Sequence, residues 1–236
     1  MNFSKHLAAQ ALAREAMART AAALRPGMSE RDVAALAEQE MYALGAEGFW
    51  YHGVGALVLA GRERSRLSIS GRDYQSAGDV FLQETDVVSV DLSPVLCGAW
   101  GDYARTIFLE NGRAVLEPAQ PVTPEFAEAY AMEQTLHRLL QEFVTADTTY
   151  HQVWERVNAF LRENGWSNMD FHGNLGHSIE DDPSDRIYLE EGNHTRLSAY
   201  GKPFTFEPHV CRTSGTLGIK REQIYYFDET GHLVAM

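Results

Sequence analysis

The sequence predicts one α/β domain of 236 residues, in which two similarly built halves surround a shared metal site. Two observations predict this fold. The order helix, helix, strand, hairpin occurs twice along the chain, although the halves share no sequence identity. No Pro- or Ser-rich linker separates the halves, so we expect residues 1–236 to pack as a single domain with a pocket at the junction.

The first half is expected to begin with two helices and a strand. Apolar residues recur at helical spacing over 3–24, and the following Pro-Gly step ends that helix. Ser29 and Asp32 have the spacing of a helix cap and its acidic partner, so the second helix starts there and runs to about Leu44. The segment GALVLAG then predicts a short buried strand.

A hairpin is predicted to complete the first half. Its strands are DVVSVDLSPV and DYARTIFLE, joined by LCGAWG. Alternation puts Ser89 and Asp91 on one face and Val88, Val90 and Leu92 on the other. If the turn centres on Cys97 and Gly98, the hairpin brings Asp91 and Asp102 side by side.

The second half repeats this plan. We expect a long helix over 124–143 and a shorter one over 150–164, with Gly165 past its end. A strand and loop follow and hold His177. The segments PFTFEPHV and EQIYYFDETGHLVAM then predict paired strands.

Composition excludes several classes of function. A net charge of −13 argues against a nucleic-acid partner, because phosphate binding needs clustered Lys and Arg. Hydrophobic residues make up 44%, enough for a sizeable core, and no run approaches ~18 apolar residues, so no membrane span is expected. The amphipathic N-terminus lacks a signal-peptide core, which predicts a cytoplasmic protein. Cys97 and Cys211 are expected to be buried, reduced thiols.

Acids and imidazoles in both halves fit one dinuclear metal site, and they are Asp91, Asp102, His177, Glu207 and Glu222. Four carboxylates and one imidazole suit divalent ions such as Mn, Fe, Co or Zn. Carboxylates on core-facing strands are costly unless a cation neutralises them, and adjacent carboxylates repel. Taken singly, each residue also has an ordinary interpretation as a strand-end Asp, an exposed Glu or a hydrogen-bonded structural His.

The joint pattern of these residues resembles the methionine aminopeptidase, creatinase and prolidase family of metallopeptidases, which has the pita-bread fold. The resemblance rests on DVVSVDL, GDYARTIFL and FTFEP, on the Gly-His step, and on Pro-Gly-Met-Ser-Glu at the start of the second helix. It covers nearly the whole chain. It implies the catalytic domain alone, without the extra N-terminal domain of creatinase and prolidase.

The resemblance implies a role for each ligand of two divalent metal ions. Asp91 would chelate one ion, Asp102 and Glu222 would bridge both, and His177 and Glu207 would complete the shell around the other. Glu207 would also be the general base for the metal-bound water, whose pKa the ions lower.

The chain departs from the family at two substrate-side histidines. Ser70-Gly71 stands where the family has a His-Gly step, and the run from Ser178 to Pro183 lacks the second histidine. His52 and His209 could substitute for them as catalytic groups, since His209 follows Glu207 by two residues.

Substrate-binding candidates lie in the first half. Tyr51 and His52 belong to FWYHGVG, where such proteins line the substrate pocket. Arg66 belongs to the arginine-rich run RERSRLSISGR and offers a forked pair of donors for a substrate carboxylate. The alternative interpretation is that these arginines belong to a solvated loop and bind no substrate.

The leading functional hypothesis is a metal-dependent hydrolase that cleaves an amide or other C–N bond in a small amino-acid or short peptide-like substrate. The alternatives are a lyase or iron-dependent redox enzyme on the same scaffold, and a catalytically silent binding protein. Intact ligands argue against the silent protein, and the missing histidines argue against a plain aminopeptidase. The resemblance also allows a homodimer.

Overall fold

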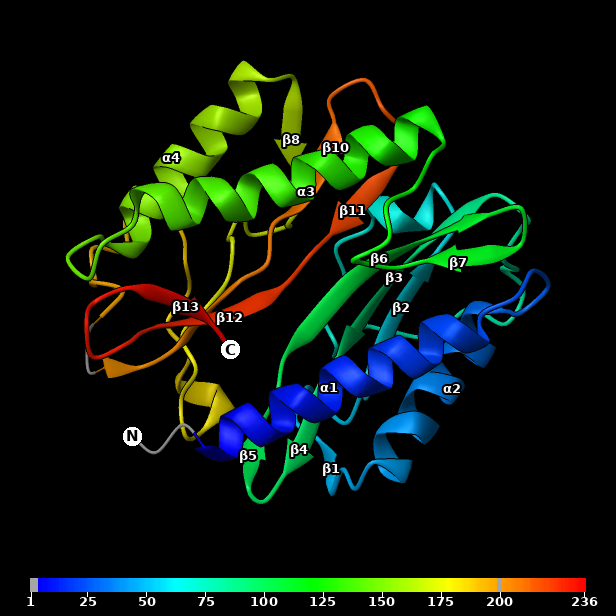
Figure 1. Cartoon of the computed structure of the whole chain (residues 1–236), viewed down its shortest axis with the longest axis horizontal. Helices are drawn as coiled ribbons and strands as arrows, with labels where there is room; N and C mark the ends of the chain where they lie inside the picture. Colours follow the sequence, from blue (N-terminus) through cyan, green and yellow to red (C-terminus); the bar gives the residue numbers. More distant parts are fainter. Residues whose placement is uncertain (1–3, 199–200) are drawn as a thin grey trace.

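The computed structural model describes residues 4–198 and 201–236, which form two halves of similar construction (Figure 1). In the first half, α1 (Ser4–Ala23) and α2 (Glu30–Ala43) pack on a four-stranded antiparallel sheet. This sheet has the order β2-β3-β6-β7, with β2 (Ala56–Ala60), β3 (Asp86–Leu92), β6 (Tyr103–Glu110) and β7 (Arg113–Val115). In the second half, α3 (Pro124–Phe143) and α4 (Tyr150–Glu163) cover two smaller sheets.

Three-stranded antiparallel sheets complete the fold. The first half contributes β1 (Gly48–Phe49), β4 (Pro94–Leu96) and β5 (Ala99–Trp100). The second half contributes one sheet of β8 (Trp166–Asn168), β10 (His209–Arg212) and β11 (Gly218–Lys220), and another of β9 (Phe204–Phe206), β12 (Gln223–Phe227) and β13 (Leu233–Ala235). Two 3-10 turns, η1 (Arg64–Arg66) and η2 (Pro183–Asp185), lie in the connecting loops.

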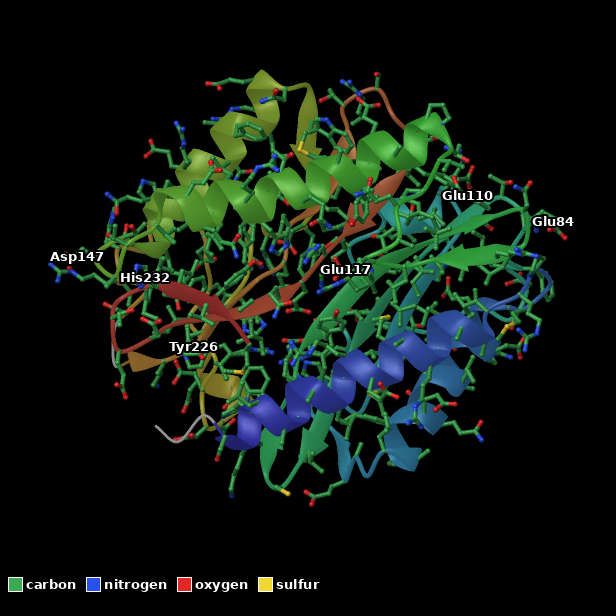
Figure 2. All side chains as sticks on the ribbon, viewed as in Figure 1. Glu84, Glu110, Glu117, Asp147, Tyr226 and His232 are labelled. Carbon is green, nitrogen blue, oxygen red and sulfur yellow. The ribbon has the colours of Figure 1, made fainter. Side chains whose placement is uncertain are left out.

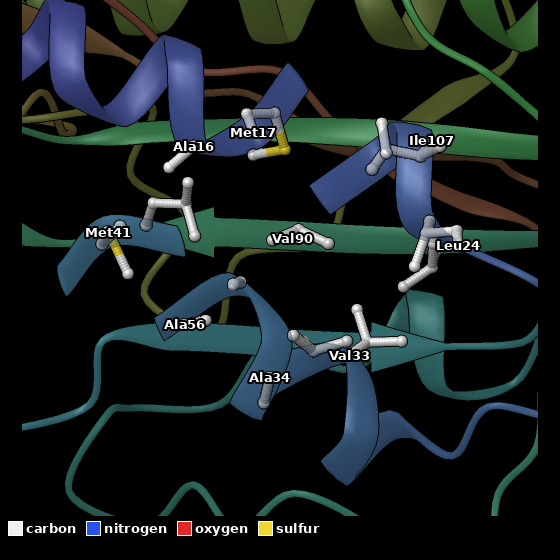
Figure 3. Close-up of a cluster of buried hydrophobic side chains, with 14 of the residues drawn as sticks. Ala16, Met17, Leu24, Val33, Ala34, Met41, Ala56, Val90 and Ile107 are labelled. Carbon is white, nitrogen blue, oxygen red and sulfur yellow. The ribbon is translucent and has the colours of Figure 1, made fainter. Parts of the chain in front are cut away.

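The two faces of β3 separate the core from the pocket. Val88 and Val90 are fully buried and pack with the side chains of α1 and α2, among them Met17 and Met41 (Figure 3). Each fully buried aliphatic side chain of this kind contributes about 1.5–3 kcal/mol. Asp91 alternates with these valines and lines a cavity on the other face. The period-2 pattern of the sequence therefore predicts correctly which face carries the acid.

Matched helix caps confirm the repeated plan. Ser29 and Asp32 form a capping box at α2, and Thr149 and Gln152 form the equivalent box at α4. In both boxes the cap residue also makes an isolated antiparallel bridge to a downstream loop, from Ser29 to Phe81 and from Thr149 to Arg196. The halves thus share local architecture without shared sequence.

The hairpin between β3 and β6 differs in two details from the sequence-based expectation. Its turn does centre on Cys97 and Gly98, which have φ values of 53° and 70°. However, Asp91 pairs with Ala104, and Asp102 lies two residues before this partner, immediately before the first residue of β6. Cys97 is exposed rather than buried because it sits at the tip of this turn, whereas Cys211 is buried.

His177 does not lie on a regular strand. It makes an isolated bridge to Tyr188 in a long connection, and the neighbouring Ser178 bridges to Phe204 of β9. The preceding Gly176 has a φ of 146°, and a Cβ there would lie 2.2 Å from the Thr205 carbonyl oxygen. Close packing of this loop on β9 therefore fixes the backbone before His177.

A partly buried ion network joins the two halves. Glu117, labelled in Figure 2, forms ion pairs with Arg105 of β6 and with Arg221, which immediately precedes Glu222. Burial alone would raise the pKa of Glu117, but the guanidinium groups of Arg105 and Arg221 have the larger combined effect. The pKa of Glu117 therefore lies below its usual value. Arg105 also donates a hydrogen bond to the Glu222 carbonyl. This network therefore holds the segment carrying Glu222 against β6.

A buried acid on α3 is expected to make the stability of the protein depend on pH. Burial raises the pKa of Glu133, on α3, from 4.5 to about 8. Between these values the native protein keeps a proton that the unfolded chain has lost. The free energy of unfolding should therefore fall as the pH rises through this window, by up to about 1.4 kcal/mol per pH unit. Urea denaturation should show that Glu133→Gln reduces this slope, while Glu142→Gln, on the exposed side of α3, leaves it unchanged. Equal slopes in both variants would contradict the assignment.

Among the described residues, no helix combines the length and the apolar character needed to cross a membrane.

Candidate active site

A cavity of about 450 Å³ lies between the halves. Its lining includes acids, the aromatic rings of Trp50 and Tyr51, and the solvent-exposed side chains of Leu67, Phe171 and Tyr188. Both halves contribute, because β2 and β3 form one side and the loops around His177 and Glu207 form the other. The cavity is therefore the pocket that the sequence predicts at the junction.

Three of the predicted metal ligands meet in one buried cluster. One ligand atom from each of Asp102, His177 and Glu222 lies within 4.8 Å of the other two. Asp102 is anchored by Gln10 of α1, whose amide exchanges two hydrogen bonds with the Asp102 backbone at 2.7 and 3.0 Å. Glu222 is anchored through its backbone N–H, which donates to the Ala104 carbonyl at 2.9 Å. We call this group the carboxylate–imidazole cluster.

The hydrogen bonds of His177 leave one ring nitrogen for a cation. Its Nδ1 lies 3.0 Å from the Ser178 carbonyl oxygen, which can only accept, so Nδ1 carries a proton. Its Nε2 lies 3.2 Å from Asp102 Oδ2 and 3.6 Å from Glu207 Oε1. A lone pair facing carboxylates is unfavourable unless a proton or a metal ion lies between them. A backbone carbonyl on the other nitrogen is also the usual arrangement of metal-binding histidines.

Among the candidate ligands, Glu222 has the surroundings that most favour a bound cation. Its side chain is completely buried, and neither carboxylate oxygen has a hydrogen-bond partner within residues 4–198 and 201–236. Burial, with Asp102 and Glu207 nearby, raises the pKa of Glu222 well above its usual value. Burial likewise raises the pKa of Asp102 to about 6. Buried carboxylates without partners are rare unless they bind metals, so the cluster fits a divalent ion in its donor set and its unmet charge.

The other two predicted ligands lie beside the cluster and share one lysine. The Lys220 ammonium is 2.7 Å from Asp91 Oδ2 and 2.8 Å from Glu207 Oε2. Burial raises the pKa of Glu207, but Lys220 and His177 lower it, and the net direction is downward. All five predicted ligands are thus brought to one region, three of them in the cluster and two around Lys220.

The predicted catalytic histidines have different surroundings. His52 is exposed at the cavity wall, with a φ of 55° and its ring 5.3 Å from that of Tyr51. His209 lines the cavity too, but it is buried and its Nε2 donates to the Ser65 carbonyl at 2.7 Å. Burial lowers the pKa of His209 to about 4, so its ring is neutral and leaves Nδ1 as an acceptor.

Of the predicted substrate-binding residues, Tyr51 lines the cavity and Arg66 does not. Arg66 is exposed on η1 and its side chain interacts with the Cys211 thiol, because the 3-10 turn directs it away from the pocket. Among the described residues, the arginines that line the cavity are Arg72 and Arg186. The loop containing Arg72 belongs to the predicted arginine-rich run, but Arg186 lies far away in the sequence.

Sequence reasoning missed Lys220, Arg186 and Trp50. Lys220 carried a signal, since it is a lone lysine two residues before a predicted ligand on a short strand. The Arg186 guanidinium carbon lies 4.5 Å from the Trp50 ring centroid, and that ring lies 6.2 Å from the His177 ring. No local pattern links these residues, because they meet only through the tertiary fold.

Comparisons with known proteins agree with this architecture. The sequence model of metallopeptidase family M24 matches residues 4–229. The fold is similar to an X-Pro aminopeptidase from Thermotoga maritima MSB8, with a TM-score of 0.77, 22% identity, and coverage of 99% of this chain and 59% of that one. It is also similar to a prolidase from Pyrococcus furiosus, with a TM-score of 0.77, 20% identity and coverage of 99% and 62%. Dipeptidase PepE from Mycobacterium ulcerans gives a TM-score of 0.76, 23% identity and coverage of 98% and 56%.

These solved structures establish the pita-bread fold predicted from the sequence. The chain spans only about three fifths of their length, as the coverage values of 59%, 62% and 56% show. No curated protein matches the sequence. The family match extends over nearly the entire chain, including every residue of the carboxylate–imidazole cluster. The chain therefore belongs to metallopeptidase family M24, a family of metallohydrolases.

Proposed function

We propose that this protein is a metal-dependent hydrolase that cleaves an amide or other C–N bond in a small amino-acid or peptide-like substrate. The observation that carries the proposal is Glu222, a buried carboxylate that has no hydrogen-bond partner among the described residues and lies in one cluster with His177 and Asp102. A divalent ion bound there would supply Lewis acidity and lower the pKa of water. Asp102, His177 and Glu222 are the residues that would hold it.

Glu207 is suited to move the proton. Its carboxylate lines the cavity, stays ionised beside Lys220, and accepts a hydrogen bond from Thr205 at 3.4 Å. An ionised carboxylate at this place can accept a proton from attacking water and return it to the leaving nitrogen. His209 is less suited, because its Nε2 proton is committed to the Ser65 carbonyl.

The position of Arg186 favours a substrate that carries a carboxylate. Its guanidinium lies over Trp50 inside the cavity, and its Nε is buried without a hydrogen-bond partner among the described residues. Its guanidinium donates one long hydrogen bond, 3.4 Å to the Tyr188 hydroxyl. Arg186 is also close enough to Glu207 to lower the pKa of that carboxyl. A carboxylate bound to this fork would place a neighbouring amide near Glu207. Dipeptides and N-acyl amino acids have this shape.

The proposal is tested by metal content and hydrolysis together. Protein purified without oxygen should contain a divalent metal by elemental mass spectrometry, and Asp102→Asn should lose it. Chelation should stop the hydrolysis of a responsive dipeptide or N-acyl amino acid, and added Mn²⁺, Co²⁺ or Zn²⁺ should restore it. Asp147→Asn, at an exposed site remote from the cavity, is the control and should retain both properties. Metal-loaded protein that hydrolyses no C–N bond across this panel would contradict the proposal.

A further inference from the structure

Lys220 places a fixed positive charge where two predicted metal ligands meet. It is the last residue of β11, and its side chain is only 20% exposed. Its ammonium bridges the Asp91 and Glu207 carboxylates at 2.7 and 2.8 Å. These are ordinary distances for a charge-assisted hydrogen bond. The ammonium is therefore a ligand-bridging cation supplied by the chain itself.

The backbone holds Lys220 in this position. Its N–H donates to Thr106 Oγ1 at 2.8 Å, and the Thr106 hydroxyl donates to its carbonyl at 3.0 Å. On the other side it pairs in register with His209 of β10. The strand is thus clamped between the first-half sheet and the second-half sheet, and the side chain projects into the cavity. Asp91 and Glu207 are its ion-pair partners in the described part of the chain.

We propose that the Lys220 ammonium takes the place of one of the two divalent ions that the five acidic and imidazole ligands would otherwise bind. The protein then holds a single divalent ion on Asp102, His177 and Glu222. This inference rests on the proposed metal-dependent function and refines it.

Electrostatics and geometry both support a single ion. An ammonium and a divalent ion cannot share the space between Asp91 and Glu207, because like charges at contact distance repel strongly in a buried site. The ligand atoms of the carboxylate–imidazole cluster already lie within 4.8 Å of one another without any contribution from Asp91. Asp91 is then an anchor for Lys220 rather than a metal ligand, and Glu207 is left ionised beside the single ion.

Metal stoichiometry tests this inference directly. Wild-type protein saturated with Mn²⁺ and freed of excess ion should contain one equivalent by elemental mass spectrometry, with the electron paramagnetic resonance spectrum of an isolated ion. Lys220→Met should bind a second equivalent and show the spectrum of a coupled pair. Lys220→Arg, which keeps the charge, and Lys5→Met, at an exposed site on α1, should both remain at one equivalent.

A second variant covers the case in which Lys220→Met does not fold. Asp91→Asn keeps an acceptor for the lysine, and under this inference it should change neither the single equivalent nor its affinity by more than a few-fold. Two equivalents in the wild-type protein, a single equivalent in folded Lys220→Met, or loss of metal in Asp91→Asn would each overturn the inference. A wild-type protein with two equivalents and hydrolytic activity would still satisfy the proposed function. If neither the wild type nor any variant bound metal, both the single-ion inference and the proposed function would be contradicted.

Discussion

Replacing Glu222 with Gln is expected to abolish metal binding while stabilising the metal-free protein. Loss of an outer partner of a metal ligand costs about 10–100-fold in metal affinity, and loss of a ligand costs more than that. Without metal, the wild-type protein buries the Glu222 carboxylate with no hydrogen-bond partner in residues 4–198 and 201–236. Replacing this carboxylate with the neutral amide of Gln should raise the free energy of unfolding of the metal-free protein by about 1–3 kcal/mol. The opposite signs of the two effects distinguish a metal ligand from an ordinary structural acid.

Two measurements check this prediction. Elemental mass spectrometry reports the metal content, and urea denaturation of chelated protein near neutral pH reports the stability. The matched control is Glu229→Gln, which changes an exposed acid a few residues further along the chain and should alter neither quantity. Full metal content in Glu222→Gln would remove Glu222 from the ligand set.

Replacing Arg186 with Met is expected to lower kcat/KM for carboxylate-bearing substrates by about 10- to 150-fold. The estimate follows from the loss of a charge-assisted hydrogen bond worth about 1.5–3 kcal/mol. Methionine keeps apolar contact with Trp50, so the cavity wall should stay in place. Metal content should not change, because Arg186 is outside the carboxylate–imidazole cluster.

The control for the Arg186→Met prediction is a second substrate that lacks the carboxylate. A paired substrate whose carboxylate is replaced by a neutral amide should be hydrolysed equally by the wild type and by Arg186→Met. Arg66→Met serves as the protein control, because Arg66 lies away from the cavity and should leave kcat/KM unchanged. Equal losses on both substrates would show that Arg186 supports the fold of the loop rather than substrate binding.

Local sequence rules predicted much of the fold for clear reasons. Helix boundaries at Ser29 and Thr149 depend on side chains that hydrogen-bond within three residues, so a short window of sequence contains the whole interaction. The alternation along β3 assigns Asp91 to the pocket face because strand geometry has a period of two. The resemblance to a known family supplied the expected role of each of the five candidate ligands.

The sequence by itself predicted the fold class, the repeated halves and the five acidic and imidazole residues that are candidate ligands. Only the tertiary structure decided how those ligands divide. It gathers Asp102, His177 and Glu222 in one buried cluster and gives Asp91 and Glu207 to Lys220. It also directs Arg66 away from the cavity and places Arg186 inside it. The physical reason is that these outcomes depend on distances between segments far apart in the chain, and burial and charge pairing across such distances are set by packing rather than by local sequence.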